Sequence, residues 1–121
     1  VLDCEMNSPS AYETLRRALK EWEQLPTALF ISSDSMVQGV LRALDEAGLS
    51  IPDQISLIAF NDTPLSQNAT PPLSSVRVLQ QELAVAAMTA MDLSRSGIQY
   101  PFKTVVPCVF VDRRSVSKAK K

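Results

Sequence analysis

The chain has 121 residues, with 12 basic and 13 acidic side chains and no histidine. This length predicts a single domain, and 45% apolar with 21% charged residues is the composition of a globular protein. The net charge of -1 lacks the basic excess of a free-standing nucleic-acid-binding domain. The absence of histidine excludes histidine-based catalytic triads and histidine metal sites from this chain.

Glycine and cysteine spacing argues against nucleotide, metal and redox sites. The glycines at 39, 48 and 97 match neither a P-loop nor a dinucleotide-binding fingerprint. Cys4 and Cys108 have no C-x-x-C partner, so we expect free thiols, no metal and no cofactor. No apolar run approaches the roughly 18 residues needed to span a bilayer, and residues 1–5 do not resemble a signal peptide. We therefore expect a cytoplasmic protein.

The first predicted element is an amphipathic helix that begins at residues 8–10. Ser8 before Pro9, or Ser10 with Glu13 as a capping box, would open it. Apolar side chains recur every three or four residues to about residue 23, including Trp22, which we assign to core packing. The short apolar run at 28–32 then predicts a strand covered on both faces.

A second helix and a second strand follow. Helical spacing continues over residues 35–47 and stops at Gly48, and the apolar run at 55–60 predicts the next strand. A strand, a helix and a strand within about thirty residues form a βαβ unit, in which the two strands are parallel. The sequence therefore predicts an α/β fold with a parallel sheet.

The remaining residues predict a loop, a helix and short β segments. Polar residues 61–72 indicate a long loop with a helical turn around 65–68, followed by an extended segment at 73–79 and a helix at 80–95. Two β segments, 103–106 and 108–111, are separated by Pro107. Residues 115–121 are predicted to be a flexible basic tail.

Polar side chains follow both predicted strands of the βαβ unit. Ser33 and Asp34 come after the first strand, and Asn61 and Asp62 after the second. Ligands of open parallel sheets bind beyond the carboxyl ends of the strands, so these residues should face one crevice. Hydroxyl, amide and carboxylate groups together suit a polyhydroxylated ligand such as a sugar.

Two other interpretations of these residues remain open. Ser33 or Asp34 could simply cap the following helix, and Asn61 with Asp62 could form an Asx-type turn. Asp34 and Asp62 could also be the paired carboxylates of a glycosidase, although acids at strand ends are common in α/β proteins. We expect no catalytic residue.

Six motifs follow one another along the chain: P-T-A-L-F at 26–30, S-D-S-M at 33–36, G-V-L-R-A-L at 39–44, A-G-L at 47–49, I-P-D-Q-I-S-L-I-A-F-N-D at 51–62 and P-P-L-S-S-V-R at 71–77. In sequence and spacing they resemble the C-terminal effector-binding region of the lactose-repressor/galactose-repressor (LacI/GalR) family of bacterial transcription regulators. The likeness covers nearly the whole chain.

The resemblance implies a periplasmic-binding-protein-like fold of type I, with a three-layer parallel sheet flanked by helices. A small effector, usually a carbohydrate, would bind in a cleft between two subdomains, and an N-terminal helix-turn-helix domain outside these residues would read operator DNA. The chain would then be an incomplete fragment, with residues 1–114 forming the C-terminal part of the effector-binding domain. Residues 1–77 and 107–114 would belong to the C-terminal subdomain, and residues 78–106 would cross to the other.

The resemblance also implies residue roles. The family's effector contacts fall on Ser33, beside Asp34, and on Asn61, beside Asp62, with Met6 near a position that is often aromatic. Many relatives carry Asn at the first position and a carboxylate at the second, so this chain departs from the pattern at both. Val78 stands at a position that is often polar. Dimerisation through the second helix would use four apolar side chains, Met36, Val37, Val40 and Leu41.

These observations predict the effector-sensing and dimerisation region of a cytoplasmic transcriptional regulator without catalytic activity. Its partners would be a small-molecule effector, a second copy of the chain, and operator DNA through the absent domain. A sugar-binding protein of a transport system, which shares the fold, is the alternative.

Overall fold

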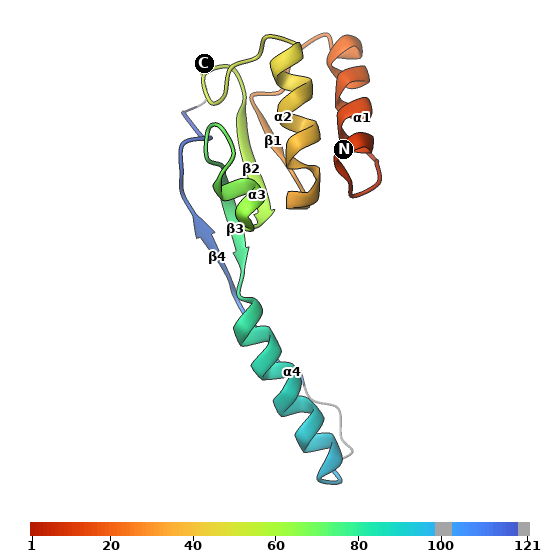
Figure 1. Cartoon of the computed structure of the whole chain (residues 1–121), viewed down its shortest axis with the longest axis vertical. Helices are drawn as coiled ribbons and strands as arrows, with labels where there is room; N and C mark the ends of the chain where they lie inside the picture. Colours follow the sequence, from red (N-terminus) through yellow and green to blue (C-terminus); the bar gives the residue numbers. More distant parts are fainter. Residues whose placement is uncertain (99–102, 119–121) are drawn as a thin grey trace.

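The computed structural model describes residues 1–98 and 103–118 and contains a four-stranded sheet in the order β1-β2-β3-β4 (Figure 1). Its elements in chain order are α1 (Ser8–Glu21), β1 (Ala28–Phe30), the 3-10 turn η1 (Asp34–Met36), α2 (Val37–Glu46), β2 (Ser56–Asn61), α3 (Pro64–Gln67), β3 (Ser74–Val78), α4 (Gln80–Arg95) and β4 (Cys108–Val111).

The predicted parallel βαβ unit is confirmed. β1 pairs with β2 in parallel, with Ala28 opposite Ser56 and Phe30 opposite Ile58. β2 pairs with β3 in parallel as well, because α3 and the loop after it return the chain to the edge of the sheet where β2 begins. The predicted helical turn at 65–68 corresponds to α3, and the predicted helix at 80–95 is α4.

Two details of the β prediction need correction. β4 runs antiparallel to β3, with Val76 opposite Phe110, so the sheet is mixed rather than wholly parallel. Residues 103–106 form no strand. Val105 is 72% exposed, so the apolar side chains that suggested a strand are not buried by the described part of the chain.

The first helix begins as predicted but has a different cap. Asn7 is the N-cap of α1, and its side-chain oxygen accepts a hydrogen bond from the Ser10 amide at 2.9 Å. Ser8 and Pro9 are therefore the first helical residues, where the missing N–H of proline has no consequence. The buried stripe of α1 consists of Ala11, Leu15 and Ala18.

The core lies between the sheet and the paired helices α1 and α2. Leu57 and Ala59 on β2 are fully buried against this layer, together with Leu44 of α2. The alternate residues of the sheet face the other way, where Phe30 is 60% exposed and Phe110 is 54% exposed. The described residues thus supply two of the three expected layers, a sheet and the helices on one face (Figure 1).

Helix α4 extends away from the sheet (Figure 1). None of its described side chains is buried, and Val85, Met88 and Met91 are each at least 59% exposed. Its large apolar side chains are therefore left uncovered by the described part of the chain. This arrangement fits the expectation that residues 78–106 cross to a second subdomain, which stays a prediction. No described helix is long and apolar enough to cross a membrane.

Ser115 and Ser117, in the predicted flexible tail, are bonded to the sheet. Ser115 is fully buried, its Oγ donates to the Leu57 carbonyl at 2.6 Å, and the same Oγ accepts from the Ser74 amide at 2.8 Å. Ser117 is bonded to Ser56 in the same region. Residues 115–117 therefore tie the starts of β2 and β3 together, and the final part of the predicted tail, residues 119–121, lies outside the described residues.

Candidate functional site

The loops after β1 and β2 meet at the carboxyl edge of the sheet. Because the two strands are parallel neighbours, Ser33 and Asn61 leave the sheet on the same side. A direct bond joins the loops, since the Thr63 amide donates to Asp34 Oδ2 at 2.5 Å. We call this edge, with Ser33 on the first loop and Asn61 at the end of β2 where the second loop begins, the rim.

Ser33 caps the turn η1. Its Oγ accepts from the Ser35 amide at 3.4 Å and lies 2.9 Å from Ser35 Oγ. The capping interpretation is therefore correct for Ser33. The residue is only half-buried, so its hydroxyl still has solvent access at the rim.

Asp34 is buried, with 2% of its surface exposed. Besides the Thr63 amide, its Oδ2 accepts from Ser66 Oγ at 2.8 Å, and Ser66 is itself fully buried in α3. Asp34 therefore does not cap its own turn. Its carboxylate faces the interior and connects two loops.

The backbone turns sharply where β2 ends. Asn61 has φ of 102° and Asp62 has φ of 60°, two consecutive left-handed residues without glycine. Such conformations cost about 1–3 kcal/mol each and persist only where neighbouring bonds enforce them. The bond from Gln67 Nε2 to the Asp62 carbonyl at 2.7 Å is one such restraint.

The Asp62 side chain is the centre of a buried ion-pair cluster. Its two carboxylate oxygens accept from Arg77 Nε at 2.7 Å and from an Arg113 guanidinium nitrogen at 2.6 Å. Burial alone would raise the pKa of Asp62, but the hydrogen bonds from Arg113 and Arg77 outweigh burial and hold its pKa below the ordinary value. Asp62 therefore forms neither an Asx turn nor an open ligand site.

A hollow of about 360 Å³ opens beside Asn61. Arg77, Val78 and the start of α4, residues 80–82, also line it. Sequence reasoning did not assign a site role to Arg77, although it ends the P-P-L-S-S-V-R motif at the predicted strand edge. The role of Arg113 had no signal in the sequence, because 51 residues separate it from Asp62.

Met6 lies beside the rim. Its carbonyl accepts from Ser35 Oγ at 2.7 Å, so the segment before α1 is fastened to η1. The Met6 side chain is 69% exposed. The structure thus brings Met6 and Ser33 to the same part of the molecule.

The predicted dimerisation residues divide between core and surface. Val37 is fully buried and Val40 is 7% exposed, so both pack into the chain's own core and are withdrawn from the interface. Met36 and Leu41 are half-buried. The outward side of α2, which we call the outer face, carries Gln38, Leu41, Arg42 and Asp45, and these residues border a hollow with Thr70 and Pro71.

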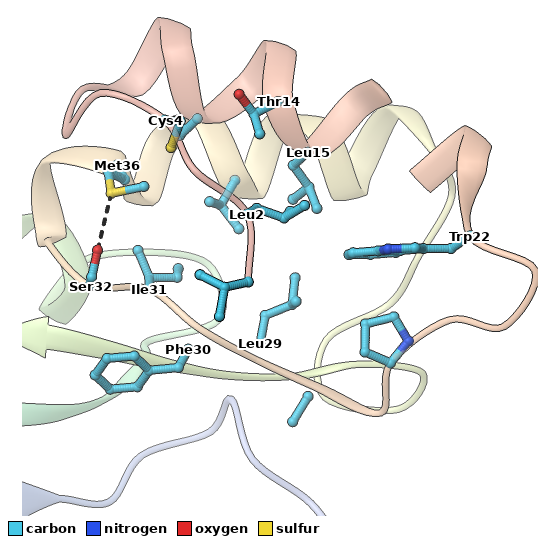
Figure 2. Close-up of a pocket in the computed structure, with 15 residues that line it drawn as sticks. Leu2, Cys4, Thr14, Leu15, Trp22, Leu29, Phe30, Ile31, Ser32 and Met36 are labelled. Atoms are coloured by element: carbon cyan, nitrogen blue, oxygen red, sulfur yellow. Dashed lines mark hydrogen bonds between the residues drawn. The ribbon is translucent and has the colours of Figure 1, made fainter. Parts of the chain in front are cut away.

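Another hollow, of about 560 Å³, lies elsewhere, between β1 and the segment before α1. Figure 2 shows Leu2, Leu15 and Leu29 reaching into it, with Trp22 at one end. β1 is the end strand of the sheet, so its outer edge is unpaired among the described residues. An apolar hollow at a strand edge has few polar groups for a polyhydroxylated ligand, so we place the candidate site at the rim.

Comparisons with known proteins agree with this architecture. A family model described as a periplasmic binding protein-like domain matches residues 2–116. The HTH-type transcriptional regulator GalR of Streptococcus thermophilus is 42% identical over 103 residues, which are 85% of this chain and 30% of GalR. The chain belongs to the periplasmic binding protein-like family, in its LacI/GalR branch. The family suggested by the motifs is therefore confirmed.

Two further relatives match most of this chain. The lactose operon repressor of Rhizobium radiobacter is 35% identical over 102 residues, 84% of this chain and 90% of that protein. A LacI family transcriptional regulator from Arthrobacter sp. FB24, solved in complex with lactose, superposes with a TM-score of 0.82 at 25% identity, over 94% of this chain and 43% of that one. This chain is part of the effector-binding domain of a LacI/GalR protein. It spans 30% of the length of GalR.

The glycosidase interpretation loses its structural basis. Asp34 and Asp62 are both buried, and their carboxylates are bonded to Ser66 and to two arginines respectively. The relatives named above are a transcriptional regulator and an operon repressor. Among the described residues there is also no group of three side chains that could hold a metal ion.

Proposed function

We propose that the chain senses a small polyhydroxylated effector, a sugar, at the rim, and that effector binding modulates operator binding by a DNA-reading domain outside this chain. The bond between Thr63 and Asp34 carries the proposal, because it brings the loops of Ser33 and Asn61 together. The Ser33 hydroxyl and the Asn61 amide can both donate and accept, as sugar hydroxyls require.

The rim supplies further groups for such a ligand. Arg77 has 46% of its side chain exposed while it holds Asp62, so its guanidinium borders the hollow beside Asn61. Met6 offers an apolar surface next to the Ser33 loop. Asp34 and Asp62, which we expected to touch the effector, support the rim from inside instead. The lactose-bound Arthrobacter relative has the same fold, which favours a carbohydrate.

The mechanism is linkage between two binding events. An effector that prefers one closure state of the two subdomains shifts the population toward that state, and the geometry of a dimer changes with it. The protein would act in the cytoplasm, where its relatives regulate transcription. A sugar-binding protein of a transport system is the second candidate. The relatives named above are regulators, which favours the regulator over the transport protein.

Thermal unfolding with a ligand panel tests the effector proposal. We expect lactose, ribose or a sugar phosphate to stabilise the protein, by about 2.7 kcal/mol at 100 times its dissociation constant. Asn61→Ala should weaken the binding about tenfold, because it removes a hydrogen-bonding group from the rim. Asn68→Ala, an exposed asparagine after α3, is the matched control and should bind like the wild type.

Stabilisation by nucleosides or amino acids alone would contradict a carbohydrate effector. Equal binding by wild type and Asn61→Ala would contradict the location of the site.

We also propose that the outer face of α2 is the surface for self-association, as an isologous contact between two copies. Gln38→Lys places a charge on each side of the two-fold axis and should weaken dimerisation at least tenfold in sedimentation equilibrium. Gln24→Lys, which makes the same change at an exposed site between α1 and β1, should leave dimerisation unchanged. Equal weakening by both variants, or a wild type that stays monomeric, would reject this surface.

A further inference from the structure

We propose that Asp34 is a positioning residue that sets the spacing of the two loops of the rim, an inference that rests on the effector site proposed above. Asp34 follows Ser33 directly in the chain, and Thr63 follows the Asn61-Asp62 pair. The Asp34 carboxylate therefore acts from one loop on the residue that ends the other. It reaches no effector itself, since it is 2% exposed.

The bonds of Asp34 are of a strong type. An ionised carboxylate that accepts from an amide and a hydroxyl makes charge-assisted hydrogen bonds, which are roughly twice as strong as neutral ones. Oδ2 accepts both, from the Thr63 amide at 2.5 Å and from Ser66 Oγ at 2.8 Å. Oδ1 is buried and has no partner among the described residues. Both hydrogen bonds of the Asp34 carboxylate therefore come from the second loop and α3.

The second loop needs such an anchor because its backbone is strained. Asn61 and Asp62 both hold positive φ values, and the strain must be balanced on both sides. Arg77 and Arg113 hold the Asp62 side chain. Asp34 holds the next residue, Thr63, through its amide.

Loss of the Asp34 bond frees one end of this strained turn. The turn can then relax toward ordinary backbone angles, which changes the position of Asn61 relative to the Ser33 loop. A ligand that must bond to both loops loses affinity when their spacing is no longer fixed. Asp34 therefore controls affinity at the rim without touching the ligand.

Four variants of the full protein test this role. Asp34→Asn keeps the volume but removes the charge. Ser66→Ala removes the second bond to Oδ2 together with the contact of Ser66 Oγ with the Thr63 carbonyl at 3.1 Å. Ser115→Ala is the control for simple destabilisation, because it deletes a fully buried hydroxyl with two bonds at the opposite end of the strands. Ser75→Ala deletes a buried hydroxyl that has no partner among the described residues.

The first measurement needs no ligand. Hydrogen exchange of the Thr63 amide should accelerate at least tenfold in Asp34→Asn and stay within twofold of wild type in Ser115→Ala and Ser75→Ala. Unchanged exchange in Asp34→Asn overturns the proposal, whether or not a sugar binds.

The second measurement is the dissociation constant of lactose by calorimetry. We expect about tenfold weaker binding by Asp34→Asn, a smaller loss with Ser66→Ala, and wild-type affinity in both control variants. Accelerated Thr63 exchange with unchanged lactose affinity in Asp34→Asn would show a structural bond only and reject the positioning role. If Ser115→Ala weakens binding as much as Asp34→Asn does, general destabilisation explains the loss and the role is rejected too. A wild type that binds no sugar refutes the proposed function. The exchange measurement needs no ligand, so it still tests the bond between Asp34 and Thr63 in that case.

Discussion

Replacement of Asp62 by alanine is expected to lower the free energy of unfolding by about 3 kcal/mol, the low end of the range for breaking a buried ion pair. The Asp62 side chain has no solvent exposure, and Arg113, one of its two partners, is only 18% exposed. Arg77 contributes less because solvent screens its half-exposed side chain. Chemical denaturation of wild type and variant measures the difference.

The same cluster predicts how stability depends on pH. The pKa of Asp62 is lower in the folded chain than in the unfolded chain, so its ion pairs stabilise the fold above the unfolded pKa, about 3.9. That stability is lost as the pH falls from about 4 through the lower pKa of the folded state. Asp62→Asn should therefore lose less stability than wild type over this acid range. Parallel acid profiles for the two proteins would contradict the assigned ion pairs.

Gly39→Ala is expected to destabilise the protein by about 3 kcal/mol, the upper end of the usual range for overpacking. A Cβ at this position would lie 2.0 Å from the Ser8 carbonyl oxygen and 2.9 Å from the Tyr12 amide nitrogen. Both are backbone atoms of α1, so no side-chain rotation can make room and the two helices must separate. Alanine normally stabilises a helix relative to glycine, so a loss of stability in Gly39→Ala would show the steric contact with α1.

Thermal unfolding checks this result. The control is Arg17→Ala on the exposed side of α1, which should change stability by less than about 0.5 kcal/mol. A neutral or stabilising Gly39→Ala would show that α1 and α2 do not approach as closely as described.

The sequence predicted the elements with strong local patterns. The apolar runs before Ser33 and Asn61 identify β1 and β2, and the short crossover between them makes the strands parallel. The position of the rim follows from that topology alone. Local pattern was less reliable at the cap of α1, where Asn7, Ser8 and Ser10 are all suitable cap residues and only tertiary geometry selects Asn7.

Long-range contacts explain most of what the sequence could not predict. Ser115 sits in a polar, basic stretch, and nothing local indicates that it binds Leu57 and Ser74 from the far end of the chain. Val37 and Val40 point inward because their side of α2 meets the sheet, and the amino-acid sequence of the helix does not show which side that is. The same holds for Asp34, whose partners lie about thirty residues away in the chain.

The central claim is that Ser33 and Asn61 jointly bind the effector. A crystal structure of the protein with a bound sugar tests it most directly. We predict that the ligand lies at the carboxyl edge of the sheet, with its hydroxyl groups bonded to the Ser33 hydroxyl and the Asn61 amide. A sugar bound instead in the apolar hollow beside β1, or a structure in which the two loops lie apart, would contradict it.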